Sequence, residues 1–84
     1  MEKRDKILIE IAAIFRKELE DDGLEITYSS SANSVEKWDS ISNLILISAI
    51  EEKFNVVFPL DFIFKAENVG DLCDYIMENS PAVN

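Results

Sequence analysis

The 84-residue chain has no histidine and only one cysteine, Cys73. Nucleophilic catalysis by serine or cysteine most often needs histidine as the base, so Ser–His and Cys–His sites are excluded. A single cysteine can form no internal disulfide, and without histidine it cannot build a zinc site of the usual kind. The sequence therefore predicts a reducing, cytoplasmic compartment. Cys73 falls on an apolar helix face and is interpreted as an inert core thiol.

Glycine-rich motifs and long hydrophobic runs are also missing. Two glycines cannot form a loop that cradles a phosphate group. No apolar stretch approaches transmembrane length and the charged start is unlike a signal peptide, so we expect no membrane association. The adjacent acids at 21–22 and 51–52 lack EF-hand spacing, and nothing suggests a pocket that would separate their pKa values. We therefore expect no metal site and no enzyme.

Basic residues are scarce. Eight lysines and arginines stand against 17 acids, for a net charge of -9, and residues 21–84 carry all of this excess. Such a charge argues against nucleic acid or an anionic membrane as a partner. It favours basic protein surfaces and divalent cations. The alternative, that the acids only keep a small protein soluble, is equally compatible with the charge.

The periodicity of the apolar residues predicts helices and no sheet, because the alternating stretch 24–28 has no second strand to pair with. Gly23 is expected to end the first helix in the left-handed conformation. The predicted fold class is all-α: a single domain (1–84) forming a small four-helix bundle with three main helices, a short third helix and a long first loop. The expected ranges are helix one at about 3–20, the loop at 21–38, helix two at 40–54, the short helix at 60–66 and the last helix at 69–79.

The second helix is unusually apolar and has two hydrophobic stripes. One is predicted to face the core, and it comprises Leu44, Ile47, Ile50 and Phe54, with Leu46 on its edge. The other lies on the opposite side and comprises Ile41, Ile45, Ser48 and Glu52. In the short helix, Phe62, Ile63 and Phe64 are expected to crowd the core.

Ser40 stands where a loop rich in serine and asparagine gives way to the second helix. At a helix N-terminus, unpaired backbone N–H groups and the helix dipole favour an anion. One interpretation is that Asp39 or Ser40 simply caps the helix. The other is that Ser40 carries a phosphate-linked group.

Several motifs together make the chain resemble the acyl carrier protein family, including its peptidyl and aminoacyl relatives. Asp39-Ser40-Ile41 matches the family's Asp-Ser-Leu motif. Further matches are the second helix (Leu44, Ile47 and residues 49–54), the connector 57–59 and the last helix (69–76). The likeness runs from about Ile7 to Met77.

The resemblance implies a specific chemistry for Ser40. Its hydroxyl would receive 4′-phosphopantetheine from coenzyme A through a phosphopantetheinyl transferase that uses Mg²⁺. The terminal thiol of that arm would then hold acyl or aminoacyl groups as thioesters for acyl-loading and acyl-transfer enzymes. By analogy, a cargo cavity would lie between the second helix and the short helix, around Phe62, Ile63 and Phe64. The alternatives are an unmodified helical protein–protein interaction module and an inactive carrier-like subunit.

Two departures from the family pattern concern the surface near Ser40. The first turns of the second helix carry Ser42, Asn43 and Ile45 where the family often has acids. We therefore interpret Ile41 and Ile45 as an apolar docking stripe, with packing under the loop or short helix as the alternative. Trp38 replaces a small residue and is expected to be partly buried. The residues predicted to bind partners, in a monomeric carrier, are Asp39, Ile41, Ile45, Glu51 and Glu52.

Overall fold

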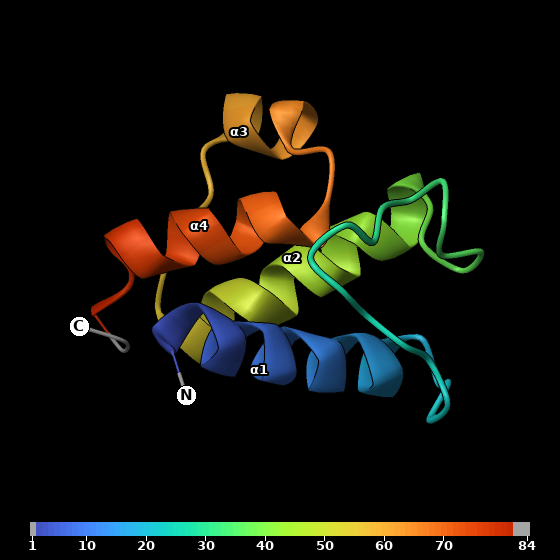
Figure 1. Ribbon diagram of the computed structural model, residues 1–84. Coiled ribbons are helices and arrows are strands. Elements are labelled where there is room, and N and C mark those ends of the chain that lie inside the picture. The colour runs from blue at the N-terminus through green and yellow to red at the C-terminus, as the bar shows by residue number, and fades with distance from the viewer. Residues whose placement is uncertain (1, 82–84) are drawn as a thin grey trace.

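The structure is a computed structural model that describes residues 2–81, and its regular elements are all helices (Figure 1). They are α1 (Lys3–Glu18), α2 (Ser40–Phe54), α3 (Leu60–Lys65) and α4 (Val69–Asn79). No strand occurs within residues 2–81. The predicted all-α fold with one short third helix is confirmed, and α2 and α4 have the ranges expected from the sequence.

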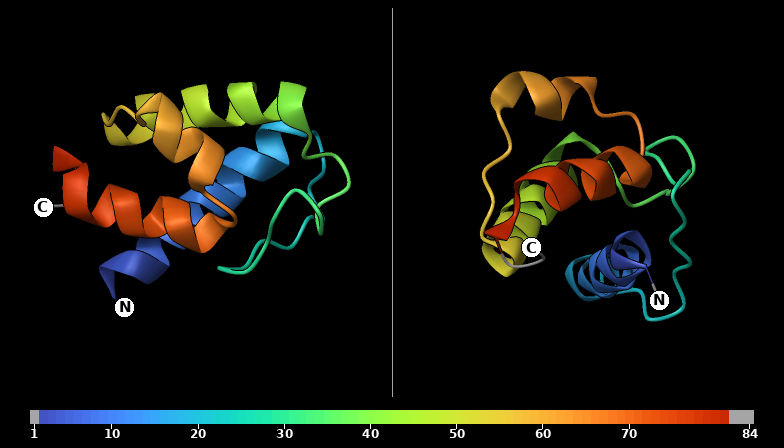
Figure 2. Two further views of the ribbon diagram at one scale, coloured as in Figure 1. Left: turned by 90° about the horizontal axis from the view of Figure 1, so that it is seen from above. Right: turned by 60° about the vertical axis from the view of Figure 1, so that its left-hand side comes forward.

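Helices α1, α2 and α4 form the base of the molecule, in which α1 packs against both α4 and α2. The short helix α3 lies above the base, between α2 and α4 when seen from above (Figure 2). The core lies inside the base, and its fully buried large side chains include Ile7, Ile11, Phe15, Leu46, Ile50, Val69 and Ile76. None of the residues of α3 is fully buried.

The first helix ends at Glu18, two residues earlier than predicted, and Gly23 does not adopt the left-handed conformation that was expected to end it. Glu20 instead takes the left-handed conformation, with φ of 52°. The backbone N–H of Asp21 then reaches back to the carbonyl of Arg16 at 2.9 Å. The chain thus terminates α1 with a non-glycine residue in the left-handed region, which a sequence rule based on glycine does not detect.

The long loop between α1 and α2 is held against the base. Ile26 and Val35 bury their side chains in the core. The backbone N–H of Gly70 donates to the carbonyl of Tyr28 at 2.7 Å, and that of Val69 donates to Ser30 at 2.9 Å. A Cβ atom at Gly70 would lie 3.0 Å from the Tyr28 oxygen. Glycine is needed there because the loop backbone approaches α4 so closely.

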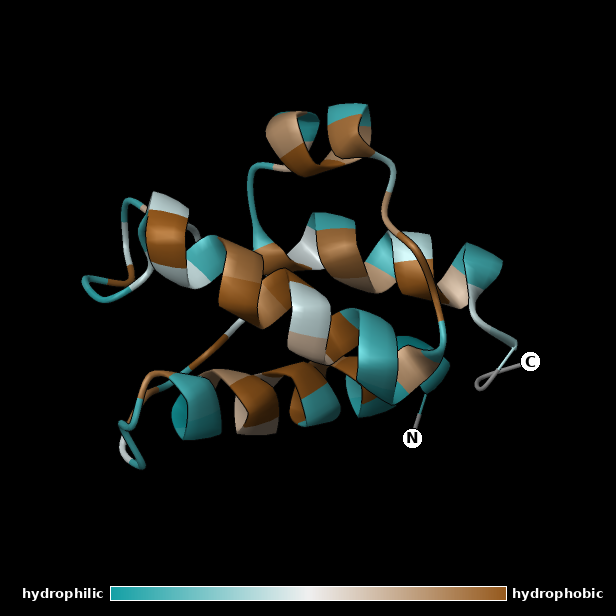
Figure 3. Ribbon diagram, turned by 180° about the vertical axis from the view of Figure 1, so that it is seen from behind, coloured by the Kyte–Doolittle hydropathy of each residue, from teal (hydrophilic) through white to brown (hydrophobic). Residues whose placement is uncertain are grey.

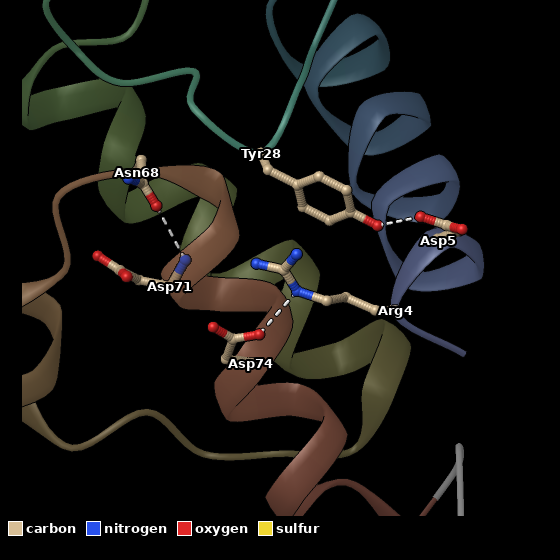
Figure 4. A network of polar contacts seen from close by, with 6 residues as sticks. All are labelled: Arg4, Asp5, Tyr28, Asn68, Asp71 and Asp74. Atoms are coloured by element: carbon tan, nitrogen blue, oxygen red, sulfur yellow. Dashed lines mark hydrogen bonds and ion pairs between the residues drawn. The ribbon is translucent and has the colours of Figure 1, made fainter. Parts of the chain in front are cut away.

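A polar network fixes the same loop to the outside of α1 and α4 (Figure 4). The guanidinium of Arg4 lies 4.0 Å from the centre of the Tyr28 ring and pairs with Asp74 at 2.8 Å. The Tyr28 hydroxyl donates to Asp5, and this hydrogen bond is the main reason that the pKa of Tyr28 is raised to about 12. The loop is therefore anchored to the start of α1 and, through Arg4, to α4.

The two hydrophobic stripes of α2 are divided differently from the prediction. Leu46, Ile47, Ile50 and Phe54 are buried, whereas Leu44 is 64% exposed. Successive helical residues are about 100° apart, which places Leu44 about 60° from Ile41 and about 120° from Ile50. The assignment of Leu44 to the core was therefore wrong. Hydrophobic residues recur along the first half of α2 and in α3 (Figure 3).

The short helix ends at Lys65, one residue before the predicted end. Of its three residues expected to crowd the core, Phe62 and Ile63 are half-buried, but Phe64 is 80% exposed. A six-residue helix can turn only one side toward the base, so Phe64 is left on its outer side. The prediction for Phe64 was wrong.

Candidate functional site

Ser40 is the first residue of α2, and Asp39 is the residue that caps the helix. One carboxylate oxygen of Asp39 accepts hydrogen bonds from the backbone N–H groups of Ile41 at 3.0 Å and Ser42 at 2.9 Å. In return, the Asp39 N–H donates to the Ser42 hydroxyl at 2.9 Å. This reciprocal capping box fixes the start of α2. The interpretation of Ser40 as the capping serine is wrong, since the side chains of Asp39 and Ser42 perform that role.

The Ser40 side chain is therefore available for chemistry. The residue is exposed, and none of the hydrogen bonds found within residues 2–81 involves its hydroxyl. An exposed hydroxyl on the first residue of a rigidly capped helix is accessible to a modifying enzyme and has a fixed position. Both properties suit a point of covalent attachment.

The anion environment at Ser40 differs from the one expected from the sequence. Asp39 already occupies the N–H groups of Ile41 and Ser42, so few backbone donors remain for a phosphate. Its carboxylate also stays charged, because the hydrogen bond from the Ser42 backbone, followed by that from Ile41, lowers the pKa of Asp39. A phosphodiester on Ser40 would consequently extend into solvent and would not be wrapped by the helix terminus.

A cavity of about 210 Å³ opens beside Ser40. It lies between the start of α2, the end of α3 and the start of α4. Its lining includes Trp38, Ser40, Asn43, Ile47, Ile63, Ala66 and Leu72. The predicted cavity around the short helix is thus present but displaced: Ile63 lines it, whereas Phe62 and Phe64 do not. Ala66, whose small side chain leaves space at the end of α3, was the overlooked signal.

Trp38 forms the inner wall of this cavity and is more deeply buried than predicted, at 9% exposure. Its indole edge meets the Phe15 ring, with centroids 4.9 Å apart and planes at 88°. Its ring N–H donates to the side-chain oxygen of Asn43 at 2.9 Å. The residue before Asp39 is therefore a core residue and not part of an outer docking surface.

The residues predicted to bind partners lie in three settings. Ile41 and Ile45 are 74% and 51% exposed, so their packing under the loop is excluded, and they share a face with Leu44, which the prediction missed. Glu52 is also exposed, and it lies about two turns beyond Ile45 on the same face. Glu51 is half-buried, and its carboxylate accepts a hydrogen bond from the backbone N–H of Phe58 at 2.8 Å.

The single cysteine is buried and the acids form no metal site within residues 2–81. Cys73 is fully buried, and this burial raises its thiol pKa to about 12, which fits an inert core thiol. Among the described residues, no group of acids and cysteine is arranged to hold a metal ion. Within the same part of the chain, no helix has the length and apolarity required to cross a membrane.

A helical bundle that offers an exposed hydroxyl at a capped helix start, next to a small cavity, fits a small carrier domain. A family model described as "Phosphopantetheine attachment site" matches residues 9–76. Acyl carrier proteins of Helicobacter pylori J99 and Helicobacter acinonychis are 34% and 33% identical over 73 residues, which cover 87% of this chain and 94% of each relative. The chain belongs to the acyl carrier protein family.

A solved structure supports the same assignment. The solution structure of the holo acyl carrier protein from Geobacter metallireducens has a TM-score of 0.78 and 37% sequence identity, and the match covers 84% of this chain and 82% of that one. The protein is thus a carrier of acyl groups on covalently attached 4′-phosphopantetheine, and it is not an enzyme. It works with a phosphopantetheinyl transferase and with acyl-handling enzymes. An unmodified interaction module is not favoured.

Proposed function

We propose that Ser40 is the residue that carries 4′-phosphopantetheine. The observation that supports this most directly is the exposed hydroxyl at the first residue of α2, within the part of the chain that matches the family model. The hydroxyl projects from a rigid helix start, with room for a bulky phosphodiester on its solvent side. When bound, the arm supplies a terminal thiol that holds acyl groups as thioesters.

The chain's own contribution is to present this hydroxyl and to keep the arm free. Asp39 and Ser42 hold the helix start in place through their reciprocal hydrogen bonds. The ionised Asp39 carboxylate is a like charge next to the phosphate, so it disfavours folding of the phosphate onto the helix terminus. We therefore assign Asp39 to positioning Ser40.

Phosphopantetheine transfer tests the assignment directly. The chain is incubated with coenzyme A, Mg²⁺ and a phosphopantetheinyl transferase of broad specificity, and the mass of the intact protein is measured. The wild type should gain one phosphopantetheine, and Ser40→Ala should gain none. Ser29→Ala is the matched control, because Ser29 is an exposed serine in the loop between α1 and α2 and is not part of the outer face of α2, and it should be modified like the wild type. An unmodified wild type, or an equal mass gain on Ser40→Ala, contradicts the proposal.

We also propose that partner enzymes dock on the outer face of α2 beside Ser40, with Ile41, Leu44 and Ile45 as the apolar centre and Glu52 at the edge. Three large apolar side chains that are 51–74% exposed form the kind of patch that marks an interaction site. The fitting partner surface is an apolar depression with a basic rim, since the net charge of -9 attracts basic proteins over a longer range. Glu51 contributes to this field while its carboxylate supports the connector at Phe58.

Finally, we propose that the carrier acts as a cytoplasmic monomer and binds neither nucleic acid nor anionic membranes. The charge of -9 repels phosphate-rich surfaces and second copies of the chain alike. The free thiol of Cys73 agrees with a reducing compartment. Sedimentation at physiological salt should give the mass of one chain, and a dimer would contradict the proposal.

A further inference from the structure

Ser40 lies on the border between two sides of α2. With successive helical residues about 100° apart, Ile41, Leu44 and Ile45 lie about 40–140° from it on one side. Asn43 lies about 60° away on the other side. Residues three apart on a helix have Cβ atoms about 5–6 Å apart, and Ser40 and Asn43 line the same cavity. Asn43 is therefore a polar neighbour of the attachment point, on the side away from the exposed apolar residues.

The side-chain amide of Asn43 has a defined orientation. The ring N–H of Trp38 donates to its oxygen at 2.9 Å. Because an indole N–H only donates, this oxygen must face Trp38 and the amide nitrogen must face away. The indole itself is held in the core by its edge-to-face contact with Phe15. Within residues 2–81 no hydrogen bond uses the amide nitrogen of Asn43, so its two N–H groups are available to a ligand.

A phosphodiester on Ser40 would find few other donors close by. Among the described residues that line the cavity, none is basic, whereas Asp39 and Glu67 are acidic. Lys37, the basic residue closest to Ser40 in the sequence, directs its ammonium group to a backbone carbonyl at the end of α1 at 3.4 Å. Two backbone N–H groups at the start of α2 are already bonded to the capping carboxylate. The amide of Asn43 is an uncharged donor on the same helix, one turn away.

We propose that Asn43, with its amide oriented by Trp38, donates a hydrogen bond to the phosphodiester on Ser40 and so positions the base of the arm. The proposal rests on attachment at Ser40. A hydrogen bond to a charged acceptor is stronger than one between neutral groups, so a single amide can bias the phosphate toward its own side of the helix. The phosphate then lies away from the outer face of α2, which stays uncovered for partner enzymes, while the rest of the arm remains free.

NMR of the apo and holo forms tests the contact. Intact mass first shows whether one phosphopantetheine is attached at Ser40, and failure of this step overturns the attachment and the proposal with it. In the ¹⁵N-labelled chain, a side-chain N–H resonance of Asn43 should then shift downfield between the apo and holo forms. Asn68, whose amide lines the cavity from the start of α4, should shift less. An unchanged Asn43 amide in a fully modified chain, or a larger shift at Asn68, overturns the proposal and leaves the attachment intact.

Asn43→Asp removes the donor and keeps the rest of the helix start. Its carboxylate still offers an oxygen to the Trp38 N–H, but the amide nitrogen is replaced by an oxygen that repels the phosphate. The ³¹P resonance of the holo variant should therefore shift from its wild-type position. Asn79→Asp is the matched control, because it makes the same change of charge at an exposed residue at the far end of α4, and its ³¹P resonance should not move. Equal ³¹P positions in wild type and Asn43→Asp contradict the proposal.

Trp38→Phe tests the orienting bond. The variant keeps an aromatic ring beside Phe15 but has no ring N–H, so the amide of Asn43 is free to turn over. The downfield shift of this amide between the apo and holo forms should decrease, and an undiminished shift would show that Trp38 does not orient it. Should Trp38→Phe fail to fold, hydrogen exchange of the Trp38 ring N–H decides. Exchange should be faster in Asn43→Ala than in the wild type, and equal rates contradict the orienting bond.

Discussion

The inner and outer faces of α2 carry the same kinds of side chain, yet one is buried and the other is open. Ile50 is 0% exposed, whereas Ile45 is 51% and Ile41 is 74% exposed. The inner face packs into the base with α1, while α3, with its six residues, leaves Ile41 and Ile45 uncovered. Hydrophobicity in this helix therefore has two uses: the inner face stabilises the fold, and in our proposal the outer face binds partners.

The largest difference between the faces is expected in stability. Ile50→Ala should lower the free energy of unfolding by about 2–5 kcal/mol, because it opens a hole in the core that the neighbours fill only partly. Ile45→Ala should change it by less than about 0.5 kcal/mol, since a half-exposed side chain loses little burial and alanine favours the helix. Urea denaturation of both variants measures the two changes in the free energy of unfolding. Equal losses would show that the outer face is part of the core.

The next largest effect is expected in acyl transfer. Ile45→Glu should reduce transfer to a cognate partner enzyme about tenfold, equivalent to about 1.4 kcal/mol, since it places a charge in an apolar interface. The melting temperature should remain nearly unchanged. Ile9→Glu is the matched control, because Ile9 is 53% exposed on α1, and it should leave transfer intact. A large loss of stability in Ile45→Glu would contradict the assignment of this residue to a surface.

The contrast between Leu44 and Ile50 shows what the sequence can and cannot predict. Local periodicity and capping residues were sufficient to predict α2 and α4, because both helices begin at a side chain that bonds to their first turn, Asp39 and Asn68. A helix with apolar residues on several sides, however, has no unique buried face. Leu44 was assigned to the core on spacing alone, and only the position of α1 shows which stripe is covered.

The candidate site was predictable to the same degree. The motif around Ser40 and the start of its helix could be predicted, because both depend on residues that are neighbours in the sequence. The capping bonds that occupy the backbone N–H groups of Ile41 and Ser42 depend on side-chain conformation. The displacement of the cavity from Phe62 toward Ala66 depends on contacts with Phe58 and Tyr75, which are brought together only by the tertiary fold.

The adjacent acids Glu51 and Glu52 also lie on different sides of α2, and a smaller difference in stability is expected between them. Glu51→Ala should destabilise the protein by about 1 kcal/mol, because the buried side of α2 loses the carboxylate that accepts the Phe58 N–H. Glu52→Ala should be neutral within about 0.5 kcal/mol, since Glu52 lies on the exposed face. Thermal unfolding at one ionic strength measures both. A reversed order would mean that the bond to Phe58 contributes nothing to the fold.

The smallest effect is expected at Asp39, where the two faces of α2 begin. Its carboxylate has a lowered pKa in the folded state because it accepts hydrogen bonds from Ser42 and Ile41. The stability that it contributes is therefore complete above its ordinary pKa of 3.8 and is lost as the pH falls through the lower folded value. Asp39→Asn retains a capping oxygen, so its melting temperature should stay within a few degrees of the wild type at pH 7 and should fall less steeply below pH 4.

Asp39→Ala is the comparison for the melting temperatures measured at low pH, because it removes the capping oxygen as well as the charge. Its melting temperature should be lower than that of Asp39→Asn at every pH, and the difference should not depend on pH, since neither side chain titrates. Both variants should still accept phosphopantetheine if Asp39 only positions Ser40, with slower modification of the alanine variant because its helix start frays. Failure of Asp39→Asn to be modified, with its helix start intact by NMR, would instead show that the transferase reads the carboxylate itself.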